Sequence, residues 1–265
     1  MDLGLANARV LVTGGASNIG RGIVHGFAAE GARLVIADVD AEQAAKVQTE
    51  ALERGAAQAE LAIGDLTEDG AGERAVAPLL DRWGGIDVLV NNAGWSVPGF
   101  LAEDTDRAKW QRTVEINFFT AIACTQAAIP PMREAGAGAI VFIASDAAFG
   151  QIRQGIYGAT KAALIALART TAREHGRHGI RANVVCPGLV LPESPDAVGS
   201  DSLWAVGQDA VFNDQQIDYL KKDTPLRRLT TAADIASTVT WIASDRAARQ
   251  VTGQVLSVSG GYTMP

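Results

Sequence analysis

A phenol and an amine stand four residues apart in the stretch IYGATKAALIAL, which spans residues 156–167. Residues i and i+4 lie on one face of a helix, so the Tyr157 hydroxyl and the Lys161 amine can reach one site. A core tyrosine beside a lysine whose stem packs on apolar surface would also explain the pair. The pair alone therefore only raises acid–base chemistry as a hypothesis, and the elements around it must decide.

The composition narrows the class of protein. The chain has 265 residues, 48% of them hydrophobic, and a formal net charge of −7. We expect residues 1–265 to form one globular domain, and the acidic balance disfavours nucleic acid as a partner. No uncharged apolar run reaches about 18 residues, so no membrane span is expected. Cys124 and Cys186 lie in apolar runs without metal-ligand spacing, which predicts a cytoplasmic protein with no metal site.

Short β-branched runs alternate with alanine-rich segments of helical period along the chain. The runs are apolar on both faces, which is typical of a parallel sheet covered by helices on each side. The pattern predicts an α/β fold, a doubly wound seven-stranded parallel sheet of the Rossmann type. The expected strands are 9–14, 33–38, 59–65, 86–92, 139–145, 180–188 and 253–261. The expected helices are 19–30, 40–54, 69–83, 106–134, 157–176 and 231–243.

The segment 192–224 breaks this alternation, since it is rich in Asp, Ser, Gly and Pro. It is too long for an ordinary connection, and we expect it to form a lid, with a disordered loop as the alternative. Within it, FNDQQIDYLKK (212–222) has helical spacing and predicts a short helix. Trp204 either contacts a ligand or anchors the segment to the rest of the protein.

The first expected strand runs directly into TGGASNIGRG, residues 13–22, and then into a helix. Glycines allow a tight turn against a pyrophosphate, and the helix N-terminus supplies unpaired N–H groups and a positive dipole end. The next strand ends at Asp38, whose carboxylate can accept both hydroxyls of an adenosine ribose and would repel a 2′-phosphate. No Arg or Lys follows in DVDAEQ, so NAD is expected rather than NADP. Alternatively, Asp38 only caps the next helix.

These motifs together resemble the short-chain dehydrogenase/reductase (SDR) family over residues 8–263. The resemblance rests on TGGASNIG (13–20), Asp38, GDL (64–66), NNAG (91–94), Asn117 in INFF, Ser145 in IAS, YGATK (157–161), CPG (186–188) and TGQVLSVSGG (252–261). It implies an NAD-dependent alcohol dehydrogenase or ketone reductase, which interconverts a secondary alcohol and a ketone by hydride transfer. The family resemblance also implies a homotetramer that acts on a small molecule.

The resemblance assigns roles to four catalytic residues. Tyr157 would exchange a proton with the substrate oxygen, and its pKa would be lowered by Lys161 and by the positive nicotinamide ring. Lys161 would also hold the nicotinamide ribose. Ser145 would bind and polarise the substrate oxygen, while Asn117 would anchor a water that connects Lys161 to solvent. Besides Tyr157 and Lys161, the implied cofactor contacts are Gly14, Ser17, Asn18, Ile19, Gly20, Asp38, Asp65, Leu66, Asn91, Ala93, Gly94, Pro187, Gly188 and Val190.

The sequence departs from the family pattern in three places. Asn18 stands at the middle glycine of the turn, and asparagine tolerates the left-handed conformation better than other non-glycine residues. Pro192 lies near the place where a threonine often contacts the cofactor. The interval from Ser145 to Tyr157 is 12 residues, one fewer than is common, which a loop can absorb.

The substrate is predicted only by class, as an alicyclic, aromatic or hydroxyacyl-type alcohol or ketone. Acidic residues outnumber basic ones in the expected lid, which favours a neutral substrate over a bulky anionic thioester. The positions expected to face the substrate are Trp95, Ser145, Asp146, Gln151, Arg153, Trp204 and Phe212.

Two other functions use the same fold. A non-catalytic NAD-binding scaffold subunit would typically lack one of the four catalytic residues, all of which are present. A lyase or epimerase would return the cofactor unchanged, and net formation of NADH from an alcohol would exclude it. The fold alone does not choose among these functions.

Overall fold

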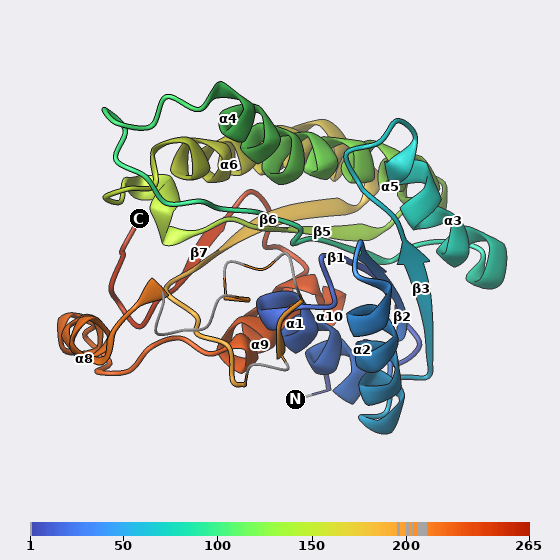
Figure 1. Cartoon of the computed structure of the whole chain (residues 1–265). Helices are drawn as coiled ribbons and strands as arrows, with labels where there is room; N and C mark the ends of the chain where they lie inside the picture. Colours follow the sequence, from blue (N-terminus) through green and yellow to red (C-terminus); the bar gives the residue numbers. More distant parts are fainter. Residues whose placement is uncertain (1, 195–196, 200–201, 203, 206–210) are drawn as a thin grey trace.

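The computed structural model describes residues 2–194, 197–199, 202, 204–205 and 211–265 of the chain. In these residues, seven parallel strands form one sheet of order β3-β2-β1-β4-β5-β6-β7, which confirms the predicted Rossmann-type fold (Figure 1). The strands are β1 (Arg9–Thr13), β2 (Arg33–Asp38), β3 (Gln58–Ile63), β4 (Val88–Asn91), β5 (Gly138–Ile143), β6 (Ile180–Pro187) and β7 (Val255–Val258).

Helices cover both faces of the sheet, as Figure 1 shows. On one face lie α1 (Asn18–Ala29), α2 (Ala41–Glu53) and α9 (Ala232–Ala243), and on the other lie α3 (Ala71–Trp83), α5 (Thr120–Ala135) and α6 (Gly155–His175). Side chains along each strand alternate between the two layers. In β1, Val10 and Val12 belong to the core under α1, whereas Leu11 belongs to the core under α3 and α5.

Two helical segments differ from the sequence-based expectation. The helix expected over 106–134 is divided into α4 (Arg107–Val114), a π-helical turn (Glu115–Phe119) and α5. Apolar periodicity cannot reveal one widened turn, so the expectation was wrong at this point. The sequence also did not predict α10 (Asp245–Ala248), because a single turn is too short to show a period.

The expected lid is only partly within the described residues. The short helix predicted inside it is confirmed as α8 (Asp214–Asp223), which begins at a capping box formed by Asn213 and Gln216. Residues 195–196, 200–201, 203 and 206–210 of the predicted lid lie outside the described residues.

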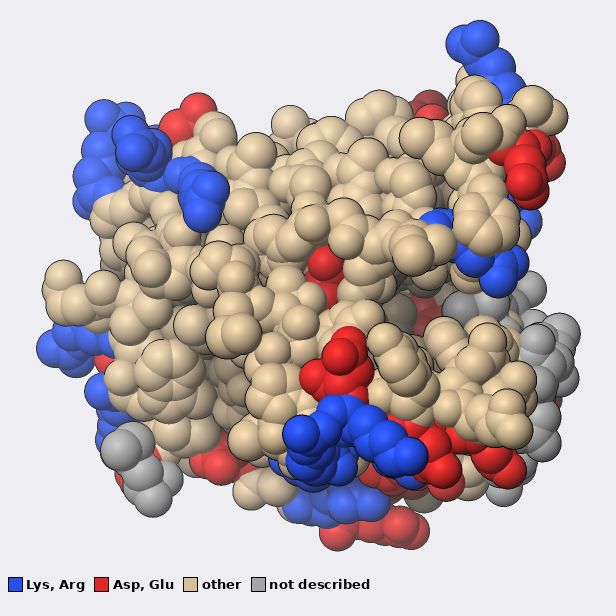
Figure 2. All heavy atoms as spheres, turned by 90° about the vertical axis from the view of Figure 1, so that its left-hand side faces the viewer, with Lys and Arg blue, Asp and Glu red and all other residues tan. Residues whose placement is uncertain are grey.

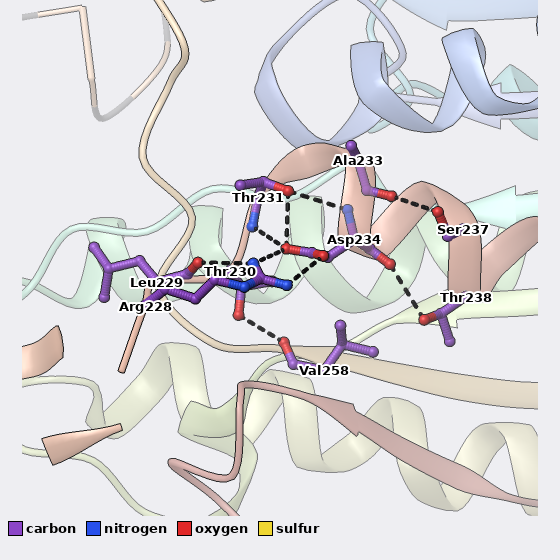
Figure 3. Close-up of polar contacts among 9 residues, drawn as sticks. All are labelled: Arg228, Leu229, Thr230, Thr231, Ala233, Asp234, Ser237, Thr238 and Val258. Carbon is purple, nitrogen blue, oxygen red and sulfur yellow. Dashed lines mark hydrogen bonds and ion pairs between the residues drawn. The ribbon is translucent and has the colours of Figure 1, made fainter. Parts of the chain in front are cut away.

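Helix α9 begins at a second capping box, drawn in Figure 3. The Thr231 hydroxyl accepts the N–H of Asp234, and the Asp234 carboxylate accepts the N–H and O–H of Thr231. Arg228 donates two hydrogen bonds to this carboxylate, at 2.6 and 2.8 Å, and holds the pKa of Asp234 well below its usual range. Thr230 donates to the Val258 carbonyl at the end of β7. These contacts fix the start of α9 beside the sheet.

The start of α9 in turn fixes α1 through two glycines. A Cβ at Gly22 would lie 2.6 Å from the Cβ of Ala232, and a Cβ at Gly26 would lie 3.0 Å from that of Ala236. Only glycine allows the two helices to approach so closely. The close contact with α9 therefore fixes the position of α1 and of its N-terminus.

The order of the strands creates a crevice at one edge of the sheet. The chain leaves β1 for β2 and β3, and then crosses back to place β4 on the other side of β1. Open α/β sheets bind ligands outside the carboxyl ends of the strands at such a switch point. The turn after β1 and the NNAG segment after β4 both lie there.

Among the described residues, no helix has the length and apolar character needed to cross a membrane. That part of the chain also has no group of three or more His, Cys, Asp or Glu side chains placed to hold a metal ion.

Candidate active site

The turn between β1 and α1 is closed by glycines. Gly14 has a φ of +59°, and a Cβ at Gly20 would lie only 1.9 Å from the Gly14 carbonyl oxygen. Asn18 has a φ of +39°, so it adopts the positive φ that we expected it to tolerate in place of glycine. Its side-chain amide donates to the Val190 carbonyl at 3.3 Å. The turn is thus tight, and the Ser17 hydroxyl beside it accepts the N–H of Gly199 at 3.4 Å.

The N-terminus of α1 offers hydrogen-bond donors to an anion. Ser17 is the N-cap residue but makes no side-chain cap bond, and the first turn carries no acidic residue. Ile19 packs on the core, which directs the first turn. Unpaired N–H groups and the positive dipole end suit a pyrophosphate. The cradle therefore fits the phosphates of a dinucleotide.

Asp38 at the end of β2 faces this turn. Its carboxylate accepts the N–H of Ala16 at 2.9 Å and the N–H of Asp40 at 3.1 Å, and burial raises its pKa. The following helix is capped by Asp40, whose side chain accepts the N–H of Gln43. The capping alternative is therefore wrong for Asp38, and its carboxylate lies at the edge of the cradle.

The NNAG segment braces the turn through a residue that we did not predict. The Asn92 amide donates to the carbonyls of Thr13 and Gly14, both at 2.9 Å, and the Ala93 N–H donates to the Thr13 hydroxyl. The Asn91 side chain instead donates to the Thr125 hydroxyl in α5, inside the protein. Because side chains alternate along a strand, adjacent asparagines point to opposite faces, and this alternation could have identified Asn92.

Other predicted cofactor residues follow β3 and β6. Asp65 is exposed, and its carboxylate accepts the N–H and O–H of Thr67 at 2.9 and 2.7 Å. A Cβ at Gly188 would lie 3.0 Å from the Cα of Ser259, so Gly188 lets two turns pack closely. Both segments end at the edge of the sheet that carries the cradle. The remaining predicted contacts in these segments are Leu66, Pro187 and Val190.

Lys161 lies in the interior of the protein. It is 3% exposed, and its ammonium donates to the Ile143 carbonyl at 2.9 Å, at the end of β5. Its Nζ is 5.6 Å from the centre of the Tyr157 ring, so helix α6 brings the two side chains together. Burial lowers the pKa of Lys161 to about 8. An ammonium has three donors, and Ile143 is the only hydrogen-bond partner recorded in the described residues, so two donors remain for a ligand.

Tyr157 is half-buried in the first turn of α6. Burial raises the pKa of its phenol, and a hydrogen bond with Ser145 acts in the opposite direction. Ser145 follows β5, and its hydroxyl accepts the N–H of Ala147 at 3.1 Å. The protein groups alone therefore raise the pKa of Tyr157, and the lowering expected from Lys161 and the positive nicotinamide ring together stays a prediction.

Asn117 occupies the π-helical turn. Its side-chain oxygen accepts the N–H of Trp95 at 2.6 Å, and its amide donates to the Trp95 carbonyl and the Thr160 hydroxyl. A Cβ at Gly94 would lie 3.1 Å from the Lys161 Nζ and 3.4 Å from the Asn117 side-chain oxygen. The segment after β4 therefore lies directly against the lysine and the asparagine. π-Helical turns occur frequently at functional sites.

Comparison with known proteins matches this arrangement. A family model described as enoyl-(acyl carrier protein) reductase covers residues 14–263. The chain is 36% identical over 262 residues to the (2S)-[(R)-hydroxy(phenyl)methyl]succinyl-CoA dehydrogenase subunit BbsD of Thauera aromatica, with 99% of each chain covered. It is 31% identical over 264 residues to the 3-oxoacyl-[acyl-carrier-protein] reductase FabG of Staphylococcus epidermidis, covering 97% of this chain and all of that one.

A solved structure agrees over the same length. A 7α-hydroxysteroid dehydrogenase complexed with NADH and 7-oxo glycochenodeoxycholic acid superposes with a TM-score of 0.87 at 32% identity, covering 98% of this chain and 96% of that chain. The chain belongs to the short-chain dehydrogenase/reductase family. It is accordingly an NAD(P)-dependent oxidoreductase of the SDR type.

Three of the positions expected to face the substrate of this SDR lie near the opening of the site. Trp95 follows Gly94, and the Arg112 guanidinium lies 4.9 Å from the centre of its ring. Gln151 and Arg153 are exposed in the loop that precedes α6. Trp204 instead packs on Phe212, with ring centres 6.1 Å apart.

Asp146 was expected to face the substrate, and the structure places it elsewhere. It is 1% exposed, and one carboxylate oxygen accepts from the Ser257 hydroxyl at a long 3.4 Å. Burial raises its pKa to about 6, although hydrogen bonds from Thr263 and Ser257 oppose the shift. Asp146 is the first residue of a short 3-10 helix (Asp146–Phe149) that begins directly after the extended residue Ser145. Asp146 therefore belongs to the core beside β7 and not to the pocket.

One narrow cleft in the described surface is lined in part by Tyr157. This cleft, which Val97 and Arg153 also line, has about 10 Å³, room for about one water molecule. A larger hollow of about 480 Å³ is lined by Arg33, Gln58, Arg82 and Trp83 and lies away from the catalytic residues.

Figure 2 shows the side of the molecule on which α8 and the C-terminus lie. Uncharged residues fill most of the upper and middle part of this face, acidic side chains lie near its centre, and Lys and Arg form groups near its corners and at its lower centre.

We predict that Gly94→Ala lowers kcat/KM by roughly tenfold or more, because the new methyl group would displace the Lys161 ammonium or the Asn117 amide. Gly176→Ala is the matched control, since Gly176 has a helical φ of −56° and nothing lies within 4 Å of a Cβ there. Steady-state kinetics of both variants measure the effect. Equal kcat/KM values for Gly94→Ala and Gly176→Ala would contradict the prediction.

Proposed function

We propose that this SDR is an NAD-dependent oxidoreductase that interconverts a secondary alcohol and a ketone. The supporting observation is the cluster at the carboxyl ends of β4 and β5. There, Ser145 lies close enough to Tyr157 to act on the pKa of its phenol, the buried Lys161 lies beside the Tyr157 ring, and Asn117 contacts the same segment as Lys161. Beside it lies the glycine cradle that fits a dinucleotide. A proton-transfer group thus lies next to a cofactor site.

The residues divide the reaction among them. When bound, the nicotinamide supplies or accepts the hydride. Tyr157 gives its proton to the carbonyl oxygen in reduction and accepts the hydroxyl proton in oxidation. Ser145 donates a hydrogen bond to the same oxygen and polarises it. Lys161 uses its two remaining donors to hold a ribose hydroxyl and to return the proton, and its pKa of about 8 suits exchange near neutral pH.

Asn117 holds this arrangement together in the proposed mechanism. Its amide spans the Trp95 backbone after β4 and the Thr160 hydroxyl in α6, which keeps Lys161 and Gly94 at a fixed distance. The protein occupies both N–H donors of the Asn117 amide and one lone pair of its oxygen. A water that links Lys161 to solvent would therefore donate to the remaining lone pair of the Asn117 side-chain oxygen.

The substrate class follows from the mouth of the site and from the relatives. We infer an alicyclic, aromatic or hydroxyacyl-type alcohol or ketone. The names of the relatives specify a phenyl-bearing succinyl-CoA compound, an oxoacyl group and a steroid. Trp204 and Phe212 both belong to the segment 192–224, so their contact links two parts of that segment, and the lid remains a proposal.

We further infer a homotetramer, built through the alanine-rich helices α5 and α6 in the manner implied by the family resemblance. Light scattering at micromolar concentration should give the mass of four chains, and a monomeric mass would refute the assembly. The cytoplasmic location remains a prediction. Cys124 and Cys186 are buried and free, which agrees with a reducing compartment.

We predict that NAD binds at least about 100-fold more tightly than NADP, because the Asp38 carboxylate would face the 2′-phosphate. Asp38→Ala should narrow the difference between the affinities for NAD and NADP, chiefly by weakening the binding of NAD. Asp38→Asn keeps the shape and removes the charge, so it should improve the binding of NADP. Calorimetric titration measures all six affinities, and comparable values for the two cofactors in the unaltered protein would overturn the assignment.

We predict that Tyr157→Phe retains cofactor binding and lowers kcat by roughly 10²- to 10⁴-fold, because the proton donor is removed. Lys161→Ala should weaken both cofactor binding and turnover. Tyr219→Phe is the control, since Tyr219 is 66% exposed on α8. NADH formation over a panel of secondary alcohols is the direct measurement. Near-normal turnover in Tyr157→Phe would rule out the mechanism, and no turnover with any alcohol would favour the scaffold or lyase alternatives.

A further inference from the structure

Two loops meet beside Tyr157 and form one edge of the opening, which we term the entrance rim (residues 97–101 and 149–155). The Gly99 N–H donates to the Arg153 carbonyl at 2.9 Å, and Gly99 and Gln154 form a parallel bridge. The Ser96 hydroxyl donates to the Gln154 side chain at 3.0 Å. Arg153 and Tyr157 line the same narrow cleft, so the entrance rim is continuous with the catalytic site.

The entrance rim exposes large apolar side chains. Val97, Phe100, Leu101, Phe149 and Ile152 are between 41% and 83% exposed. Grouped apolar side chains on a surface mark a binding site more often than scattered ones do. The cleft itself holds about one water, so a bulky apolar group would lie on the entrance rim and not inside the cleft.

Arg153 is the one residue of the entrance rim that carries a positive charge. Its φ is +66°, a conformation that favours glycine, yet an arginine occupies it. Its guanidinium lies 5.4 Å from the centre of the Phe100 ring, and no carboxylate pairs with it among the described residues. The nearby cation Lys109 is already paired with Asp104 at 2.7 Å. Arg153 is thus an oriented cation with unused donors.

We propose that the entrance rim binds an amphipathic substrate whose apolar body covers the exposed side chains and whose anionic group pairs with Arg153. The substrate class is then a hydroxy or oxo compound that carries a carboxylate or phosphate on the side remote from the reacting carbon. The planar, five-donor guanidinium suits both anions. The inference deepens the proposed alcohol–ketone activity and rests on it.

The acidic residues of α8 do not oppose this assignment. Asp214, Asp218 and Asp223 belong to this helix, which lies across the end of the sheet from α4 and α6 (Figure 1). The entrance rim adjoins α4 and α6, since Arg153 precedes α6 directly. A substrate with its anion at Arg153 therefore directs its uncharged end toward the lid. This revises the sequence-based preference for a wholly neutral substrate.

The test compares charged and neutral substrates in matched variants. The first ratio is the kcat/KM for (4-hydroxycyclohexyl)acetate divided by the kcat/KM for 4-ethylcyclohexanol. The second ratio is the kcat/KM for the coenzyme A thioester of 4-hydroxycyclohexanecarboxylic acid divided by the kcat/KM for the methyl ester of the same acid. Arg153→Gln should lower at least one ratio about tenfold or more, chiefly through KM. Arg153→Lys should restore much of the lowered ratio, because it keeps the positive charge. Arg112→Gln, which removes a guanidinium stacked on Trp95, should leave both ratios within about twofold.

The outcomes separate the two proposals. A loss confined to the acetate pair identifies the anion as a carboxylate, and a loss confined to the thioester pair identifies it as a phosphate; either supports the assignment. Unchanged ratios in Arg153→Gln, or an equal fall in Arg112→Gln, would overturn the role of Arg153 while leaving the alcohol–ketone activity intact. If the unaltered protein forms no NADH with any of the four alcohols while it binds NAD, the proposed function fails instead.

Discussion

A lysine ammonium held inside the protein is the constraint around which the catalytic site is built. Burying a charge without partners is unfavourable by several kcal/mol, so the structure must supply hydrogen bonds at fixed positions. For Lys161 the recorded partner is the Ile143 carbonyl at the end of β5. The end of β5, the first turns of α6 and the glycine after β4 must therefore stay in register with one another. The lowered pKa of Lys161 is a consequence of the same burial.

The cofactor cradle depends on contacts at a greater distance. The turn after β1 is tight because Gly20 touches the Gly14 carbonyl, yet the direction of α1 is set by its contact with α9. That helix starts where Thr231 and Asp234 cap each other and Arg228 holds the carboxylate. A capping box on the surface thus positions the N–H groups expected to meet a pyrophosphate. Capping contributes about 1 kcal/mol to stability, and its larger role here is geometric.

The sequence predicted the parts of the molecule that repeat a period or depend on special backbone. Strands and helices followed from alternation, and the positive φ of Asn18 followed from the steric freedom of its turn position. The burial of Asp146, the bracing by Asn92 and the rise in the pKa of Tyr157 did not. Alternation along the strand could have separated Asn92 from Asn91, whereas the burial of Asp146 and the pKa of Tyr157 depend on which groups surround them in three dimensions.

The residues proposed for the chemistry and those proposed for substrate recognition differ in where they lie in the fold. Among the candidate catalytic residues, Asn117 and Lys161 lie on helices and are buried, whereas the entrance rim lies on loops and leaves apolar side chains in water. Tyr157 lies between these regions and is only half-buried. A substrate that covers Val97, Phe100 and Phe149 would exclude water from the phenol at the same time. Since hydrogen bonds and charges act more strongly in a dry site, the bound substrate would itself complete the environment in which Tyr157 and Ser145 act on its oxygen.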